Sequence, residues 1–287
     1  MTRDTDVLLS GLTFPEGPRW HDNKLYFSDF FTYKVLSVDL TGNVETIIEL
    51  DDQPSGLGWL PDGSLLIVSM IKRKLLRFLE GNLTELADCS DLASFHCNDM
   101  VVDISGNAYI GNFGFDMSTG QGLTATNMIL VRPGEPPCIA ADELLFPNGT
   151  VISPDGKTLI VGETYAARLT AFDINSDATL SNRRVWADLA KIREDYFPVP
   201  DGMCLDEQGA IWVASPTTNE VIRIKEGGEI LDSIKVKRNA YACMLGGEDR
   251  KTLFICTSGS SDEDSCKEDK EGCIEIITVD SAGVGRP

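Results

Sequence analysis

The sequence predicts an all-β protein folded as a six-bladed β-propeller with four-stranded antiparallel blades. The main observation is a unit that recurs along the chain: a polar residue, usually beside a Gly, then an apolar run, a Gly turn and a second apolar run. The gaps between successive polar residues are 39, 43, 50, 53 and 40. Repeats of this length, with two strands visible and room for two more, are typical of propeller blades. The polar position, which we call the slot, holds Glu16, Ser55, Asn98, Asn148, Asp201 and Tyr241.

Turn signals support each unit in order. The first unit turns at Asp22-Asn23, a pair that favours a tight hairpin. In the middle four units a Gly follows the slot by eight residues, at Gly63, Gly106, Gly156 and Gly209. No stretch keeps a 3.6-residue apolar period over several turns, so no long helix is expected. Three segments interrupt the strand pattern: a predicted loop over one face at 113–122, a loop with one helical turn at 190–199, and a solvated loop at 261–272.

The ends of the chain are expected to close the propeller. An unpaired sheet edge exposes backbone donors and acceptors, and natural proteins avoid this. Residues 7–14 precede the first slot residue, so we predict that they form a strand that joins the last blade. Six similar units from end to end, sharing one closed core, favour a single domain over residues 1–287.

Composition limits the partners and the compartment. The formal net charge of −20 disfavours binding to nucleic acid or to anionic membranes, which leaves a small-molecule substrate as the expected partner. The oligomeric state stays open. The charged N-terminus lacks the apolar region of a signal peptide, so we expect a cytoplasmic protein. The eight cysteines include no CxxC pair and are expected to be reduced, with pairing of Cys266 and Cys273 disfavoured.

The propeller geometry predicts that the slot residues meet. The innermost strands run along the central channel in the same direction, so the slot residues should form a ring at one mouth. Second strands run back and should end at the same mouth, at Asp29, Met70, Asn112, Glu163, Ser215 and Thr257. Carboxylate and amide oxygens suit a hard cation such as Ca²⁺. A polar mouth filled with water is the alternative, but six aligned positions favour a binding site.

Several motifs carry a resemblance to a known family. They are Pro15-Glu16-Gly17-Pro18-Arg19-Trp20, Asn98-Asp99-Met100-Val101-Val102-Asp103, Asn148-Gly149 with Ser153-Pro154-Asp155-Gly156, Pro200-Asp201-Gly202-Met203, and Gly246-Gly247. In this order and spacing, the chain resembles the regucalcin/gluconolactonase family, also called the senescence marker protein family, over essentially its whole length. The resemblance implies a six-bladed propeller with one catalytic divalent metal. It implies Glu16, Asn148 and Asp201 as metal ligands, and Asn98 as a substrate-binding residue and additional candidate ligand.

One position departs from the family pattern. Sugar-lactone members commonly carry Arg two residues before the substrate-side Asn, where this chain has His96. Residues two apart in a strand share a face, so His96 is expected to face the substrate beside Asn98. Ser55 and Tyr241 are the remaining substrate-binding candidates in the slot. The only other histidine, His21, lies in the first turn and is expected to be exposed.

The leading functional hypothesis is metal-dependent hydrolysis of a sugar-acid or other small lactone by a metal-activated water. Asp201 is the expected proton acceptor, and His96 is the alternative. The chain has no G-x-S-x-G, H-E-x-x-H or phosphate-binding Gly loop. Ca²⁺ is the favoured metal, with Mg²⁺, Mn²⁺, Zn²⁺ and Fe²⁺ as alternatives. Hydrolysis of another ester or an organophosphate, or a non-catalytic Ca²⁺-binding propeller, remain competing hypotheses.

Overall fold

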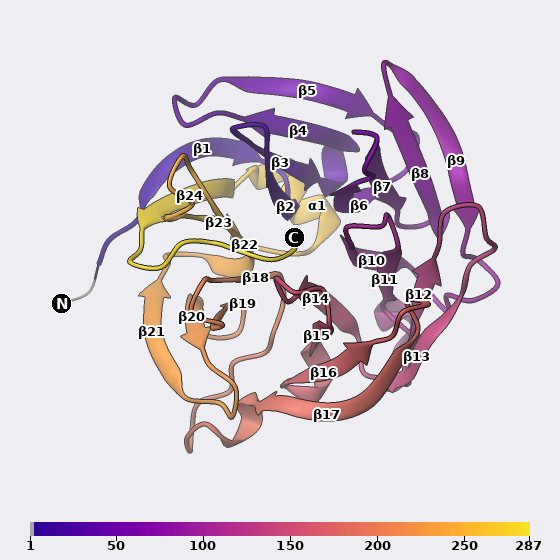
Figure 1. The fold of residues 1–287 in the computed structure, drawn as a ribbon. Coiled ribbons are helices and arrows are strands. Elements are labelled where there is room, and N and C mark those ends of the chain that lie inside the picture. Colours follow the sequence, from indigo (N-terminus) through magenta and orange to yellow (C-terminus); the bar gives the residue numbers. More distant parts are fainter. Residues whose placement is uncertain (1–2) are drawn as a thin grey trace.

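The computed structural model describes residues 3–287 and confirms the predicted six-bladed propeller. Six four-stranded antiparallel sheets form a ring around a central channel (Figure 1). Within each blade the strands follow one another in chain order from the channel outward, except in the last blade. No helix in the described part of the chain is long and apolar enough to span a membrane.

Five blades are built from consecutive strands. Blade 1 contains β2 (Pro15–His21), β3 (Lys24–Asp29), β4 (Lys34–Val38) and β5 (Val44–Glu49). Blade 2 contains β6 (Pro54–Trp59), β7 (Leu65–Ser69), β8 (Lys74–Leu79) and β9 (Asn82–Asp88). Blade 3 contains β10 (Cys97–Val102), β11 (Ala108–Asn112), β12 (Thr126–Val131) and β13 (Cys138–Leu144). Blade 4 contains β14 (Pro147–Ile152), β15 (Thr158–Glu163), β16 (Arg168–Ile174) and β17 (Leu180–Asp188). Blade 5 contains β18 (Met203–Leu205), β19 (Ile211–Ser215), β20 (Glu220–Ile224) and β21 (Ile230–Lys235).

The sixth blade closes the ring with the N-terminal strand, as predicted. It contains β22 (Asn239–Gly246), β23 (Thr252–Ser258) and β24 (Gly272–Thr278), with β1 (Asp6–Leu12) as its outermost strand. β1 pairs antiparallel to β24, so the two ends of the chain share one sheet. This pairing satisfies the outer edge of β24 and locks the first blade against the last.

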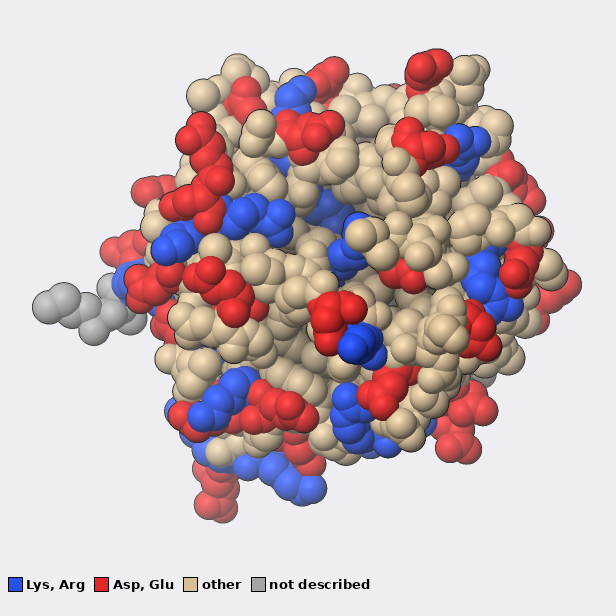
Figure 2. All heavy atoms as spheres, in the orientation of Figure 1, with Lys and Arg blue, Asp and Glu red and all other residues tan. Residues whose placement is uncertain are grey.

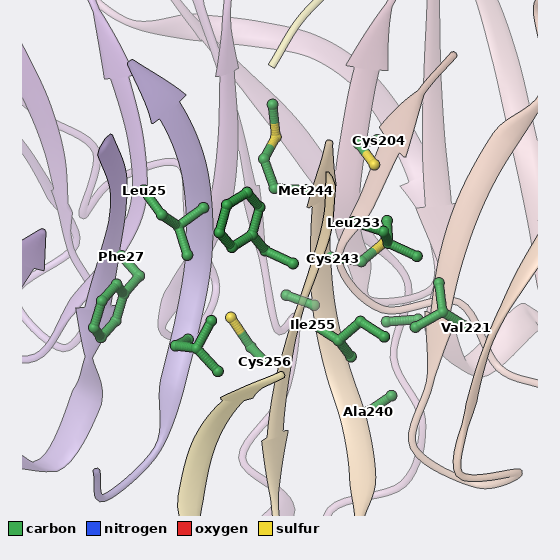
Figure 3. Close-up of a cluster of buried hydrophobic side chains, with 14 of the residues drawn as sticks. Leu25, Phe27, Cys204, Val221, Ala240, Cys243, Met244, Leu253, Ile255 and Cys256 are labelled. Atoms are coloured by element: carbon green, nitrogen blue, oxygen red, sulfur yellow. The ribbon is translucent and has the colours of Figure 1, made fainter. Parts of the chain in front are cut away.

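Apolar side chains fill the spaces between blades. The second strand of each blade is almost fully buried, because it packs against the neighbouring blade on both faces. Figure 3 shows one such cluster, where Cys256 of blade 6 lies on the side of Leu25 and Phe27 of blade 1, and Ile255 lies on the side of Val221 of blade 5. Cys204, Cys243 and Cys256 lie in the same cluster and pack as small apolar side chains. All eight cysteines are free in the structure, including Cys266 and Cys273.

The irregular segments are partly as predicted. Segment 113–122 holds a short turn, Met117–Thr119, and segment 190–199 follows the turn Leu189–Lys191. The prediction of a solvated loop at 261–272 is wrong, because this segment contains the helix α1 (Glu263–Asp269). The Asp262 side chain caps α1 by accepting from Ser265 N at 3.0 Å. Cys266 on the inner face of α1 is buried, which holds the helix against the propeller.

The C-terminal segment lies across one mouth of the channel. Ile152 N donates to Arg286 O at 2.7 Å, and Val284 N donates to Leu205 O at 3.0 Å. Ile152 and Leu205 end their innermost strands, so this mouth is the one opposite the slot residues. The C-terminus therefore lies at the centre of the ring in Figure 1. Acidic and basic side chains are interspersed over this face (Figure 2).

Candidate functional site

Five of the six slot residues lie near the start of an innermost strand, at an irregularity in the sheet, and Asp201 lies two residues before β18. In blade 1, Glu16 pairs with Ser28, whereas the next pair is Arg19 with Tyr26. The register breaks at the slot in blades 2, 3, 4 and 6 as well. A β-bulge takes a side chain out of the regular alternation, and bulges are common beside active sites. The bulge therefore explains how one repeat position presents its side chain at the channel mouth.

Glycines next to the slot allow neighbouring blades to approach closely. A Cβ added to Gly149 would lie 2.3 Å from Asp201 O, and one added to Gly202 would lie 2.4 Å from Ala242 Cβ. Neither position tolerates a side chain without movement of the backbone. Because the innermost strands are this close, the Asn148 amide donates to the Asp201 carboxylate. The Gly that directly follows the slot residue, such as Gly149 or Gly202, thus allows successive slot side chains to come together.

A cavity of about 410 Å³ opens at the slot mouth. Five of the six slot residues line it, and His96 lines it with them. Ser55 does not line it: its carbonyl oxygen accepts from Ser28 Oγ at 2.7 Å, and Gln53 lines the cavity in blade 2. Two other hollows, of about 600 and 420 Å³, flank the C-terminal segment at the opposite mouth and contain no slot residue. Six of the predicted site residues therefore line this cavity: Glu16, His96, Asn98, Asn148, Asp201 and Tyr241.

Two buried carboxyl groups dominate the electrostatics of the cavity. Burial, with a smaller contribution from the Asp99 charge, raises the pKa of Glu16 to about 8 despite the lowering effect of the Gly17 amide and Arg19. Burial and the Glu16 charge likewise raise the pKa of Asp201 well above its ordinary value. Two carboxylates that repel one another in a buried position are stabilised when a cation lies between them.

The two slot amides differ in their hydrogen bonds. Asn148 Nδ2 donates to Thr164 Oγ1 at 3.2 Å, and Thr164 Oγ1 donates in turn to Pro200 O at 2.8 Å. With its nitrogen committed to Thr164 and Asp201, Asn148 presents its amide oxygen to the cavity. Asn98 Nδ2 is buried and lacks a hydrogen-bond partner among the described residues. A buried donor without an acceptor is costly, so Asn98 is suited to a ligand that supplies an oxygen.

A buried ion pair beside the slot was not predicted as part of the site. Arg19 Nη2 donates to Asp99 Oδ1 at 2.6 Å, with both side chains more than nine-tenths buried. The same guanidinium donates to the backbone carbonyls of Pro18, Leu57 and Met100. Arg19 and Asp99 belong to the sequence motifs that carry the family resemblance, and their opposite charges were the available signal. The pair ties blades 1, 2 and 3 together next to Glu16.

The two acids at the ends of the second strands are engaged in hydrogen bonds of their own. Asp29 Oδ1 accepts from Thr13 Oγ1 at 2.6 Å and from Phe14 N at 2.8 Å. Glu163 is buried and accepts from Arg168 at 2.8 Å. Both carboxylates therefore anchor the loops at the mouth. They fix the backbone that presents the cavity lining rather than adding ligands to it.

The two histidines occupy different environments. His96 is partly buried, stacks on Phe95 at a ring distance of 3.9 Å, and lies 5.9 Å from the Phe113 ring. Burial lowers the pKa of His96 below its ordinary value, so its imidazole is neutral at pH 7. His21 stacks on Trp59 at 4.1 Å and its side chain is 35% exposed. The prediction that His21 is a freely exposed turn residue is therefore only partly right.

The donor set at the cavity fits a hard divalent cation. Glu16 and Asp201 supply carboxylate oxygens, and Asn148 supplies an amide oxygen, which are ligands of the kind that Ca²⁺ and Mg²⁺ prefer. Within the described residues, no three His, Cys, Asp or Glu side chains form a metal-binding group. A cation at this mouth would therefore depend on amide oxygens as well as on the two carboxylates.

Comparisons with known proteins agree with this geometry. A regucalcin from Danio rerio is 26% identical over 221 residues, covering 75% of this chain and 73% of the relative. Pentonolactonase XacC from Haloferax volcanii is 25% identical over 297 aligned positions, covering 99% and 96%. The solved structure of regucalcin from Agrobacterium tumefaciens, titled a calcium-binding protein, matches with a TM-score of 0.82 at 21% identity, covering 99% and 96%. That structural likeness shows the fold.

The family model described as SMP-30/Gluconolactonase/LRE-like region matches residues 14–259, which is most of the chain and includes every slot residue. The match confirms the resemblance drawn from the motifs. The chain belongs to the SMP-30/gluconolactonase/LRE-like family.

Proposed function

We propose that this protein is a divalent-metal-dependent lactonase that hydrolyses a lactone at the slot mouth. The observation that carries the proposal is that the buried carboxyl groups of Glu16 and Asp201 meet the amide of Asn148 at one cavity. Family membership and the similarity to a pentonolactonase support lactone hydrolysis as the reaction. The proposal concerns a small-molecule substrate, because the cavity has a volume of about 410 Å³.

Glu16, Asn148 and Asp201 would hold the metal, with the Asn98 amide as a further donor. When bound there, a divalent cation polarises an ester carbonyl and lowers the pKa of water. The all-oxygen donor set favours Ca²⁺, with Mg²⁺ or Mn²⁺ next. Zn²⁺ and Fe²⁺ fit less well, because the cavity lining offers one histidine and no cysteine.

The side chains of the chain itself can then orient the substrate and take up the proton. Asn98 Nδ2, which lacks a partner, donates to an oxygen of the lactone. Asp201 accepts a proton from the attacking water, whose oxygen bonds to the carbonyl carbon. The ring C–O bond breaks, and the released ring oxygen receives a proton, so that water and lactone give a hydroxy acid. His96 lines the cavity in its neutral form and contacts the substrate or serves as the alternative proton acceptor.

The test is a panel of lactones assayed on chelator-stripped protein with single metals added back. We expect no hydrolysis above background without metal, recovery with Ca²⁺ or another divalent ion, and parallel recovery of bound metal by elemental analysis. Full-rate hydrolysis by metal-free protein would refute the proposal. An aryl ester and a phosphotriester in the same panel test the competing hydrolase hypotheses. Metal binding without turnover of any of these compounds would instead favour a Ca²⁺-binding propeller.

A further inference from the structure

We propose that the substrate is an amphipathic lactone with an apolar alkyl or aryl substituent, rather than a polyhydroxylated sugar lactone. The proposal rests on the lactonase function above and names the class of lactone that the cavity takes. Its basis is the lining of the cavity, which combines a polar floor with two aromatic walls. The floor consists of Glu16, Asn98, Asn148 and Asp201. Neither wall was singled out from the sequence.

The first wall belongs to blades 1 and 6. Phe14 contacts Phe30 at a ring distance of 5.3 Å, Phe31 at 5.7 Å and Tyr241 at 4.5 Å. All four rings line the cavity, and Met70 of blade 2 packs against them. Asp29 holds this wall in place, because its carboxylate accepts from the Phe14 backbone N at 2.8 Å. The wall is therefore a fixed apolar surface rather than a set of loose side chains.

The second wall belongs to blades 3 and 4. Phe113 stacks on Phe146 with ring centroids 4.5 Å apart and planes 25° apart. Tyr165 meets Phe146 edge to face at 5.3 Å. These three rings also line the cavity. Phe113 continues toward His96, so the second wall reaches the residue that replaces the family's arginine.

The two walls start at opposite blade junctions, and Phe113 packs against the cluster of the first wall, so the apolar lining is continuous. In a closed ring of six blades, the junction of blades 6 and 1 lies across the channel from the junction of blades 3 and 4 (Figure 1). Glu16, Asn98, Asn148 and Asp201 lie between them on the innermost strands. A ligand whose polar ring contacts these four side chains would have its substituent between aromatic surfaces.

Few polar side chains of the lining remain for the hydroxyl groups of a sugar lactone. No Lys or Arg lines the cavity. Thr164 Oγ1 already donates to Pro200 O, and Glu263 pairs with Lys267 at 2.6 Å. Ser261 shares a hydrogen bond with Tyr241. Above the floor, substrate hydroxyls would depend mainly on Gln53, His96 and the hydroxyl groups of Tyr165 and Tyr241.

The energetics favour the apolar substituent. Each substrate hydroxyl buried against an aromatic wall without a partner weakens binding by roughly tenfold to a hundredfold. Each buried methylene strengthens binding by about fourfold. A sugar lactone carries a hydroxyl on almost every carbon, so the two effects act against it and in favour of an alkyl or aryl lactone.

A homologous series tests the proposal on the metal-loaded protein. The series is γ-valerolactone, γ-hexalactone and γ-octalactone, compared with D-xylono-1,4-lactone and D-glucono-1,5-lactone. We expect kcat/KM to rise by about fourfold for each added methylene, and γ-octalactone to exceed both sugar lactones by at least about a hundredfold. Sugar lactones that are hydrolysed faster than γ-octalactone would overturn the proposal.

Variants locate the effect on the walls. Phe113→Ala should raise KM for γ-octalactone by about tenfold, leave kcat within about threefold, and change γ-valerolactone little. Phe113→Leu, which keeps an apolar wall, should raise KM for γ-octalactone by less. This variant replaces Phe113→Ala in the test if the Ala variant unfolds. Phe197→Ala is the matched control, because Phe197 is 65% exposed and outside the cavity lining. Equal losses for the long and the short lactone would contradict the assignment.

Binding of lactams, which resist hydrolysis, separates this proposal from the lactonase function. Isothermal titration with 5-butyl-2-pyrrolidinone and D-glucono-1,5-lactam needs no turnover. Tight binding of the alkyl lactam without hydrolysis of any lactone would support the apolar site and refute the lactonase. Preferential binding of the sugar lactam, or binding of neither, would refute the apolar site whether or not lactones are hydrolysed.

Discussion

Arg19 in blade 1 reaches past blade 2 to Asp99 in blade 3, where Nη2 and Oδ1 lie 2.6 Å apart in a buried ion pair. Arg19 Nε also donates to Leu57 O of blade 2 at 3.0 Å, and Nη2 donates to Met100 O at 2.6 Å. One guanidinium thus joins three innermost strands beside the slot. Asp99 Oδ1 also accepts from Met100 N at 2.8 Å, so this one oxygen is held by both the guanidinium and its neighbouring backbone.

Removing one partner of this pair should destabilise the whole propeller. Arg19→Met leaves the Asp99 charge buried and unpaired, and we expect the free energy of unfolding to fall by about 3–5 kcal/mol in urea titrations. Arg77→Met is the control, because Arg77 pairs with the exposed Asp62 and should cost at most about 1 kcal/mol. Equal effects in the two variants would contradict a structural role for the Arg19–Asp99 pair.

The metal assignment predicts the behaviour of Asp201. Asp201→Asn keeps the shape of the side chain but removes one of the two carboxylate charges. We expect the affinity for the divalent metal to fall by about 100-fold or more, with loss of lactone hydrolysis. Metal content after dialysis and a metal titration measure the effect. Asp155→Asn, an exposed turn carboxylate, should leave both unchanged. An Asp201→Asn protein that keeps its full metal content would show that the cation lies elsewhere.

The sequence predicted the blades well because the repeat is local and regular. Spacing between slot residues defined the six blades, and unpaired edges predicted the pairing of β1 with β24. Five of the six slot residues were correctly expected at one mouth. Ser55 was misplaced, because the alignment cannot show which side chain of blade 2 the twisted backbone turns into the cavity. Gln53 takes that role instead.

Most contacts that the sequence did not predict involve segments outside the repeat. Asp29 and Glu163 read as extra acids at the mouth, but each finds partners in loops that the repeat pattern does not describe. Helix α1 is shorter than two turns and mostly charged, so it carries no apolar period. The aromatic walls combine residues from four blades, and only the closed ring brings them to one cavity.

Stability of the metal-free protein should depend on pH through Glu16. Its pKa of about 8 exceeds the unfolded value of 4.5, so the folded protein keeps a proton that the unfolded chain loses. The stabilisation that this bound proton provides is fully present below pH 4.5 and is lost as the pH rises through 8. Between these two pH values the free energy of unfolding falls by about 1.4 kcal/mol for each pH unit. We expect chelator-stripped protein to lose stability between pH 5.5 and 8.5 more steeply than Glu16→Gln.

Urea titrations at several pH values measure this difference. The contributions of surface carboxylates to the pH dependence cancel, because the two proteins share them. Saturating Ca²⁺ should remove the excess slope in the wild type, because a bound cation stabilises the ionised form. Parallel stability curves for the metal-free wild type and Glu16→Gln would refute the predicted protonation of Glu16.

The role of His96 can be decided from one variant and its pH profile. His96 lines the cavity, stacks on Phe95 and has a pKa lowered by burial, so any titration of its ring falls below the ordinary 6.5. If His96 contacts substrate while Asp201 takes the proton, His96→Gln should raise KM by about tenfold and change kcat by less than about threefold. The acidic limb of the kcat profile should persist. If His96 is the proton acceptor, kcat should fall by about 100-fold or more and that limb should disappear. We expect the first outcome, because His96 and Asn98 line the same cavity. His21→Gln should change neither constant.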